Sequence, residues 1–380
     1  DFLARIASYN DMYMGYVQGA GSNPWTGSIA RALENRSLKW ETTDTKNIGF
    51  DFGLFGNHLN GNINYYINET RDLLITRRIA PSAGLDNPTL NVGKMRNQGF
   101  ELELNWNDKI NDFEYNVGFN ISTIANKVVA LANEDQTIYG VGLKYGTEHF
   151  PTQTKVGKPI GAFYLYQADG IFQSLEEVQA HKNSKGELLQ PNAQPGDVRF
   201  KDMNGDGVID EDDKTYSGTG IAKVEANLNL GASYKGFDFS AVIGSAFGNK
   251  LYNGIRYYYE GMNSGSNFLK TTLNAWTPTN TKTDIPRAVF GDPNQNTRES
   301  TRFLENGDFV RLRQVQLGYT LPKALSKHIY CESIRFYVSA ENVFTITGYS
   351  GANPEFSQGV LNSGIDRFTY PFSRSYTVGA

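Results

Sequence analysis

The sequence lacks the residues and patterns on which several common protein classes depend. Its single cysteine, Cys331, excludes an internal disulfide framework, and its four histidines are dispersed without zinc-site spacing. No run of 18 apolar residues occurs, which excludes a transmembrane helix. The 36 basic and 40 acidic residues form no basic stripe, which argues against nucleic acid as a partner. In a β protein without disulfides, we expect Cys331 to be a small buried apolar residue.

What the sequence does contain is a two-residue alternation of apolar and polar side chains. In the segment from Phe100 to Trp106 every even position is apolar and every odd position is polar. Successive side chains of a strand point to opposite faces, so such a segment builds a sheet with one apolar and one polar face. About ten strands are predicted, near residues 46–56, 59–69, 98–108, 113–124, 225–235, 237–248, 309–321, 333–344 and 371–380, with a weaker candidate at 2–16.

The connections between these segments alternate in length along the chain. Four are short, at about residues 56–58, 108–112, 235–236 and 322–332, and the intervening ones are long, at about 70–97, 125–224, 249–308 and 345–370. In an antiparallel barrel, alternate connections lie at opposite rims, so short turns collect at one rim and long loops at the other. This asymmetry is typical of outer-membrane barrels and favours an antiparallel transmembrane β-barrel over a soluble sandwich.

The alternation also predicts which side chains face which way. We expect the apolar set to face lipid and the polar set to line a lumen, with aromatic residues near strand ends at the membrane interfaces. The predicted lipid-facing residues are Phe100, Leu102, Leu104, Phe119, Leu228, Leu230, Phe239 and Ile243. The predicted lumen residues are Asp51, Glu101, Glu103 and Asn105.

One segment carries the pattern of a metal-binding loop. Residues 202–213 match the twelve-residue Ca²⁺ loop, in which oxygen ligands at fixed spacings surround one cation. The predicted ligands are Asp202, Asn204, Asp206, the backbone carbonyl of Val208, Asp210 and Asp213. Gly207 supplies the sharp turn, Ile209 should pack inward, and Asp213 replaces the usual final Glu. Because no amphipathic helices flank the loop, we expect a structural Ca²⁺ clip and not a switch. The alternative is a solvated acidic turn.

Signatures of catalysis are missing. No Gly-rich loop ending in Gly-Lys-Ser/Thr is present, and no nucleophile elbow is complete. Glu101, Glu103 and Asp51 could be imagined as a glycosidase pair, but on alternating strands they more readily face a polar lumen. We therefore expect no enzymatic activity. A helix is predicted over 173–184 with Ser174 as its N-cap.

Several motifs together resemble the SusC/RagA family of TonB-dependent outer-membrane transporters. The similarity runs in the family's order over nearly the whole chain. The motifs are Leu-Lys-Trp-Glu-Thr-Thr at 38–43, Asn-Gln-Gly-Phe-Glu at 97–101, Gly-Lys-Pro-Ile-Gly-Ala-Phe-Tyr at 157–164, Pro-Gly-Asp-Val-Arg-Phe-Lys-Asp at 195–202, Phe-Val-Arg-Leu-Arg at 309–313 and Ser-Ala-Glu-Asn-Val-Phe at 339–344.

The resemblance implies that residues 1–380 are the C-terminal portion of a 22-stranded barrel in the outer membrane of a Gram-negative bacterium. It implies a SusD-like surface lipoprotein as partner, energy from the TonB complex, and oligosaccharides or peptides as cargo. Residues 125–224 would then be a long extracellular loop that contains the Ca²⁺-type loop. We expect cargo contacts in loops such as 256–259. Because the alternating pattern stops at Ala380, we also expect the chain to be part of a longer protein.

An alternative interpretation from the residues is a soluble, secreted, Ca²⁺-binding β-sandwich that acts as a carbohydrate-binding module. A closed two-sheet core would favour it over the barrel.

Overall fold

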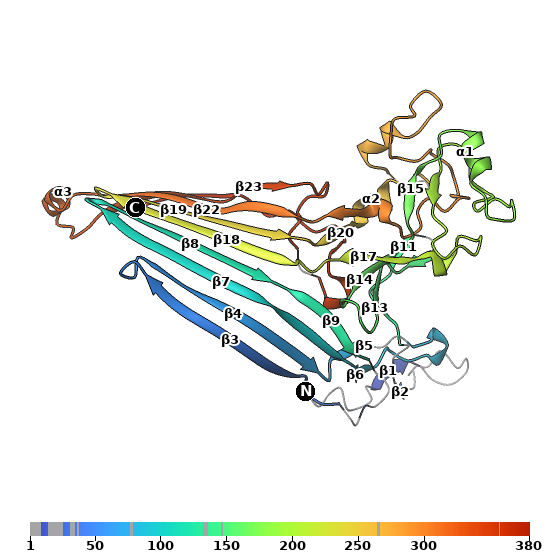
Figure 1. Ribbon diagram of the computed structural model, residues 1–380, viewed down its shortest axis with the longest axis horizontal. Coiled ribbons are helices and arrows are strands. Elements are labelled where there is room, and N and C mark those ends of the chain that lie inside the picture. Colours follow the sequence, from blue (N-terminus) through green and yellow to red (C-terminus); the bar gives the residue numbers. More distant parts are fainter. Residues whose placement is uncertain are drawn as a thin grey trace, which may run out of the picture.

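The computed structural model describes residues 9–13, 26–30, 35, 38–76, 79–131, 136–145, 147–263, 267–356 and 358–380. Its main feature is one ten-stranded antiparallel sheet (Figure 1). The strands of this sheet are β3 (Thr42–Leu54), β4 (Leu59–Arg71), β7 (Lys94–Ile110), β8 (Phe113–Thr123), β9 (Ala125–Ala130), β18 (Val224–Tyr234), β19 (Phe237–Phe247), β22 (Phe309–Thr320), β23 (Arg335–Thr347) and β25 (Ser375–Gly379).

The strands follow the order β25-β23-β22-β19-β18-β8-β7-β4-β3, and β9 pairs with β7. Neighbours in space are mostly neighbours in sequence, as in an up-and-down barrel wall. The order confirms the predicted strands and is that of one continuous sheet, so the two-sheet sandwich is wrong. The candidate at 2–16 contributes only β1 (Tyr9–Tyr13), which pairs with β2 (Thr26–Ala30) outside the main sheet. The rest of that candidate lies outside the described residues.

The connections are sorted by length between the two ends of the sheet. The short turns and α3 (Lys323–Ser326) lie at one end, and the long connections lie at the other (Figure 1). The turn between β18 and β19 consists of Lys235 and Gly236, whose φ values of 46° and 89° are both positive, as a type I′ hairpin turn requires. The predicted asymmetry of the connections is therefore confirmed.

The register places the apolar side chains on one face, which we call the apolar face. Leu104, Phe119, Leu228 and Ile243 oppose one another in a row across β7, β8, β18 and β19. All eight apolar residues predicted to share a face do share it. At the short-turn end the row ends in aromatic pairs, such as Phe237 and Tyr319 with ring centroids 4.4 Å apart. This matches the aromatic residues expected at strand ends.

The described parts of the long connections fold into a compact loop assembly, which comprises residues 136–145, 147–223, 249–263, 267–308, 348–356 and 358–366. Its strands and helices are β10 (Ile138–Tyr139), β11 (Leu143–Tyr145), β12 (Thr147–His149), β13 (Thr152–Thr154), β14 (Ala162–Leu165), β15 (Ala168–Ile171), α1 (Leu175–Ala180), β16 (Val198–Phe200), β17 (Thr215–Thr219), β20 (Lys250–Asn253), α2 (Gly254–Tyr259), β21 (Leu304–Asn306) and β24 (Ile365–Asp366). Beside it lie β5 (Leu74–Thr76) and β6 (Thr89–Asn91).

The loop assembly has its own hydrophobic core. Phe163, Tyr252, Tyr257, Phe303 and Ile365 are almost completely buried and come from all three long connections. The region expected to be a loop, 125–224, thus begins with a strand of the main sheet, β9, and the described residues from 136 onward form regular elements that pack against residues distant in the sequence. In the described residues no helix is long and apolar enough to cross a membrane.

Two local predictions have different outcomes. The helix expected over 173–184 is present but shorter, as α1, and the Ser174 hydroxyl caps it by accepting a hydrogen bond from the Glu177 amide. Cys331 was expected to be buried and is exposed. The reason is its position, since it lies in the connection between α3 and β23 at the short-turn end and not within a strand.

Candidate functional site

The face opposite the apolar face is lined by amides and carboxylates, and we call it the polar face. Asp51, Asn62, Glu103, Asn120 and Asn227 oppose one another in a row across β3, β4, β7, β8 and β18. The Asn62 amide donates a hydrogen bond of 3.1 Å to Glu103, and the Asn227 amide donates one of 2.9 Å to Asn120. The predicted lumen residues Asp51, Glu101, Glu103 and Asn105 thus share one face. This row suits binding to polar ligands more than acid–base catalysis.

Small residues on the polar face leave room for the amides. A Cβ added to Gly231 would lie 2.1 Å from the side-chain oxygen of Asn116, and one added to Gly118 would lie 3.0 Å from that of Asn105. The asparagine side chains therefore extend over glycines of the neighbouring strands. Because asparagine alternates with glycine, the side chains protrude only a short distance from this part of the polar face.

The predicted metal loop, residues 202–213, closes through hydrogen bonds to its own backbone. The Asp202 carboxylate accepts hydrogen bonds from the amides of Gly205 (2.6 Å) and Gly207 (2.9 Å). Asp206 accepts one from the Val208 amide, at 2.9 Å. Gly207 has a φ of 94°, which provides the sharp turn predicted for it.

The second half of the loop is anchored in the loop assembly. The buried Asp213 carboxylate accepts hydrogen bonds from the amides of Met203 (2.7 Å) and Asp210 (2.8 Å). Ile209 packs against the cluster of Tyr166, Val198 and Phe200, as predicted. Across the residues that the structure describes, no three or more His, Cys, Asp or Glu side chains are gathered closely enough to hold a metal ion. The assignment of Asp202, Asn204, Asp206, Val208, Asp210 and Asp213 as ligands stays a prediction.

A buried ion pair joins this loop to the rest of the loop assembly. The ammonium of Lys214 contacts Glu211 and the buried Glu299, each at 2.6 Å, and His149 contacts Glu299 at 2.5 Å. Burial alone would raise the pKa of Glu299, but the hydrogen bond from His149 and the charge of Lys214 outweigh it and lower that pKa to about 2. Glu299 is therefore an anion at neutral pH that holds the end of the acidic loop in place.

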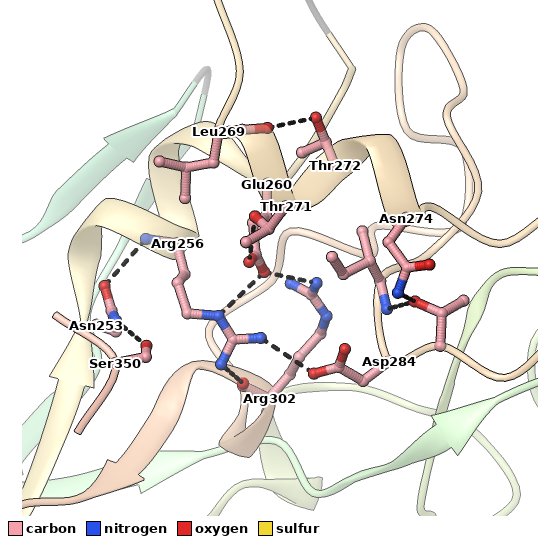
Figure 2. Close-up of polar contacts among 12 residues, drawn as sticks. Asn253, Arg256, Glu260, Leu269, Thr271, Thr272, Asn274, Asp284, Arg302 and Ser350 are labelled. Carbon is pink, nitrogen blue, oxygen red and sulfur yellow. Dashed lines mark hydrogen bonds and ion pairs between the residues drawn. The ribbon is translucent and has the colours of Figure 1, made fainter. Parts of the chain in front are cut away.

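A second buried cluster joins α2 to the connection that precedes β22 (Figure 2). Glu260 accepts hydrogen bonds from Arg256 (3.1 Å) and Arg302 (2.9 Å), and the hydroxyl of Thr271 donates to its other oxygen. Arg256 also contacts Glu305 at 3.1 Å and the exposed Asp284 at 3.4 Å. We call these residues the arginine–glutamate cluster. Each of its two arginines contacts at least one of its carboxylates, so the cluster links α2 to the segment that precedes β22 and braces the loop assembly.

The position of this cluster bears on part of one expectation. In the segment 256–259, which was expected to contact cargo, Arg256 is mostly buried in the ion pairs and Tyr257 is completely buried in the core. Tyr259 is exposed, and cargo contact by this segment stays a prediction. No sequence signal identified the cluster, because Arg302 lies 42 residues from Glu260 and Glu305 lies 49 from Arg256. Only the folded chain brings these charges together.

Known proteins are similar to this chain in sequence and in architecture. The family described as "TonB dependent receptor-like, beta-barrel" matches residues 4–343. A TonB-dependent receptor, P3, of Formosa agariphila is 30% identical over 368 residues, which are 94% of this chain and 36% of that protein. The TonB-dependent receptor SusC of Bacteroides thetaiotaomicron is 28% identical, over 91% of this chain and 32% of its own length.

A solved structure of the RagAB peptide transporter superposes on 99% of this chain and 38% of that chain, with a TM-score of 0.76 and 24% identity. That likeness shows the shared fold. The chain spans about a third of the length of the relatives it matches. These relatives are receptors and not enzymes, which agrees with the absence of a predicted catalytic site, and the resemblance to SusC and RagA is confirmed. The chain belongs to the TonB-dependent receptor-like β-barrel family.

Proposed function

We propose that this chain forms part of the barrel wall of an outer-membrane importer of the SusC/RagA type, which takes up oligosaccharides or peptides. The observation that carries the proposal is that the main sheet of this chain, a member of the receptor family, has one apolar and one polar face. Its apolar face runs across nine strands and would contact lipid, while the amides and carboxylates of its polar face would line the path of a polar nutrient. Asp51, Glu101, Glu103 and Asn105 lie on that path.

The partners of the whole transporter are part of the same proposal. We expect a SusD-like surface lipoprotein to cover the loop side and the TonB complex to supply energy from the other side. The test is nutrient uptake by cells that carry the complete gene, compared with cells that lack it. Uptake that is unchanged by loss of the gene, across oligosaccharide and peptide mixtures, would contradict the proposal.

The orientation of the sheet in the membrane is a further part of the proposal. The loop assembly should be extracellular and the short turns, with Cys331, should face the periplasm, as in outer-membrane barrels. A cysteine introduced by Val208→Cys should react with a membrane-impermeant maleimide on intact cells, because Val208 is 57% exposed in the loop assembly. The native Cys331, although exposed, should react only after the outer membrane is permeabilised.

The labelling experiment has an internal control. Val208→Cys is made together with Cys331→Ser, so that each protein carries one thiol within residues 1–380. Cys331→Ser alone gives the background labelling of the rest of the protein. Labelling of Cys331 on intact cells, with Val208→Cys protected, would reverse the orientation.

We also propose that the loop of residues 202–213 binds Ca²⁺ as a structural clip. The ligand spacing, the turn at Gly207 and the inward packing of Ile209 support it. Extracellular Ca²⁺ is about millimolar, so even a weak site with a Kd of about 10⁻⁴–10⁻³ M would be occupied. The ion would compete with the loop amides for Asp202 and Asp206, whose oxygens already point into the loop.

Removal of one ligand tests this clip. Asp206→Ala should abolish a Ca²⁺-dependent protection of residues 195–215 and leave the strands of the main sheet unchanged, since they do not contact the loop. Hydrogen exchange of the complete protein with Ca²⁺ and with a chelator measures both regions. Equal protection of the wild-type loop under the two conditions would identify it as a self-closed acidic turn.

A further inference from the structure

A pocket lined by two arginines lies where the polar face meets the loop assembly. It has a volume of about 550 Å³, within the range of about 300–1,000 Å³ that is usual for small-molecule sites. It lies beside the bulge between β22 and β23 and is bounded by residues 351–354 and 371–374. Its lining residues are Arg311, Asn342, Phe344, Thr345, Thr347, Gly351, Ala352, Asn353, Pro354, Pro371, Phe372 and Arg374, and no Asp or Glu is among them.

Arg311 is held rigidly in the wall of this pocket. Its guanidinium donates hydrogen bonds to Thr345 (2.8 Å), Glu355 (2.9 Å) and Asn353 (2.6 Å), and it lies 4.7 Å from the ring centroid of Phe372. Only 3% of Arg311 is exposed. Three of its five N–H groups are used in these bonds, so the side chain is fixed and still carries donors.

The positive charge at the pocket is not fully balanced. Glu355 accepts hydrogen bonds from Arg311 and also from Arg313, each at 2.9 Å, so one carboxylate faces two guanidinium groups. Arg374 adds a third charge, and its exposed side chain makes no ion pair or hydrogen bond within the described part of the chain. Glu341 adjoins the lining residue Asn342 and lies opposite Ser375, next to Arg374. Three guanidinium groups therefore face two carboxylates, Glu355 and Glu341, and the pocket and its surroundings carry an excess of about one positive charge.

The rest of the polar face has the opposite character. Asp51, Glu101, Glu103 and Glu225 all lie on it by register. Another pocket on this face, near the short turns, is lined by both Lys109 and Glu114, whose charges pair at 2.6 Å. An anion that moves along this face thus meets a favourable potential at the arginine pocket, and low-dielectric walls focus such a field.

From this juxtaposition we infer that the pocket binds a carboxylate group of the transported nutrient, with Arg374 as the group that contacts it and Arg311 as the fixed charge behind it. An arginine fork matches a carboxylate with two parallel hydrogen bonds. Phe372, Pro354 and Pro371 provide apolar surface for the carbon skeleton next to the charge. The inference rests on the proposed importer function and narrows its cargo to acidic molecules. Two nutrient classes carry such a group, namely uronate-containing oligosaccharides and acidic peptides.

Binding to the purified complete transporter tests the inference. The probes are two matched pairs: tetragalacturonate with its methyl ester, and a tetraglutamate peptide with the corresponding glutamine peptide. We expect the wild type to prefer the charged member of at least one pair, which identifies the nutrient class. Arg374→Gln should weaken binding of that charged probe by roughly 10- to 100-fold, the loss expected for a charge-assisted hydrogen bond, and leave the neutral probe unchanged.

Two further variants separate charge from structure. Arg374→Lys should recover part of the affinity, because it keeps the charge and loses the fork. Arg367→Gln removes another exposed arginine outside the pocket lining and should have no effect. The inference is overturned if no charged probe is preferred, or if Arg374→Gln affects both members of a pair equally. Charged probes that bind but do not enter cells would instead count against the importer function and leave the pocket assignment standing.

Discussion

Replacement of Leu102 by arginine should destabilise the protein by roughly 2–4 kcal/mol, the cost of placing arginine on the lipid face near the bilayer midplane. Leu102 is the central residue of β7 (Lys94–Ile110), and its side chain lies on the apolar face between Ile63 and Ile121. At that depth a guanidinium has neither water nor a polar neighbour on the same face. The measurement is the free energy of unfolding of the complete protein in lipid vesicles, from denaturant titration.

The neighbouring position provides the matched control. Glu103→Arg introduces the same side chain one residue later, on the polar face. It removes the hydrogen bonds from Asn62 and Asn105 to the Glu103 carboxylate, but these groups are solvent-accessible, so the cost should be at most about 1 kcal/mol. A larger loss of stability for Glu103→Arg than for Leu102→Arg would mean that the polar face contacts lipid.

The main sheet could be predicted from the sequence because its information is local. Apolar and polar residues alternate within each strand, and short turns such as Lys235–Gly236 fix the hairpin register. The alternation is weakest in the candidate 2–16, and its described part, β1, lies outside the main sheet. The Ca²⁺-type motif at 202–213 could likewise be recognised from the sequence, since all of its positions lie within twelve residues.

The loop assembly could not be predicted in the same way, because its contacts join residues far apart in the sequence. The Arg287–Asp197 pair spans 90 residues, and the Lys214–Glu299 pair spans 85. No periodicity marks such partners. The arginine pocket has the same origin, since Arg311 lies in β22 and Arg374 lies in the connection between β24 and β25. In the sequence alone, nothing distinguishes these two arginines from the others. Its identification depends on the volume, the lining and the charge balance of the folded chain.

The arginine–glutamate cluster yields the second large expected effect, from Glu260→Gln. Glu260 and Arg302 are only 4% and 7% exposed, and Glu260 is the carboxylate that Arg302 contacts. Burial lowers the pKa of Arg302, and the charge of Glu260 is the largest influence that opposes this. A neutral amide would leave a buried guanidinium without its counter-ion. Loss of one partner from a buried pair costs about 3–5 kcal/mol.

Asp284 offers a control on the same cluster, because it contacts Arg256 at 3.4 Å but is 81% exposed (Figure 2). Asp284→Asn should therefore change stability by less than about 1 kcal/mol. Hydrogen exchange of the complete protein should show faster exchange in α2 and around residues 301–306 for Glu260→Gln, with β7 and β8 unaffected, since these strands lie outside the cluster. If both variants leave the loop assembly equally protected, the cluster does not brace it. If Glu260→Gln loosens the main sheet as strongly as the loops, the two parts unfold as one unit, and the loop assembly cannot rearrange independently of the barrel wall.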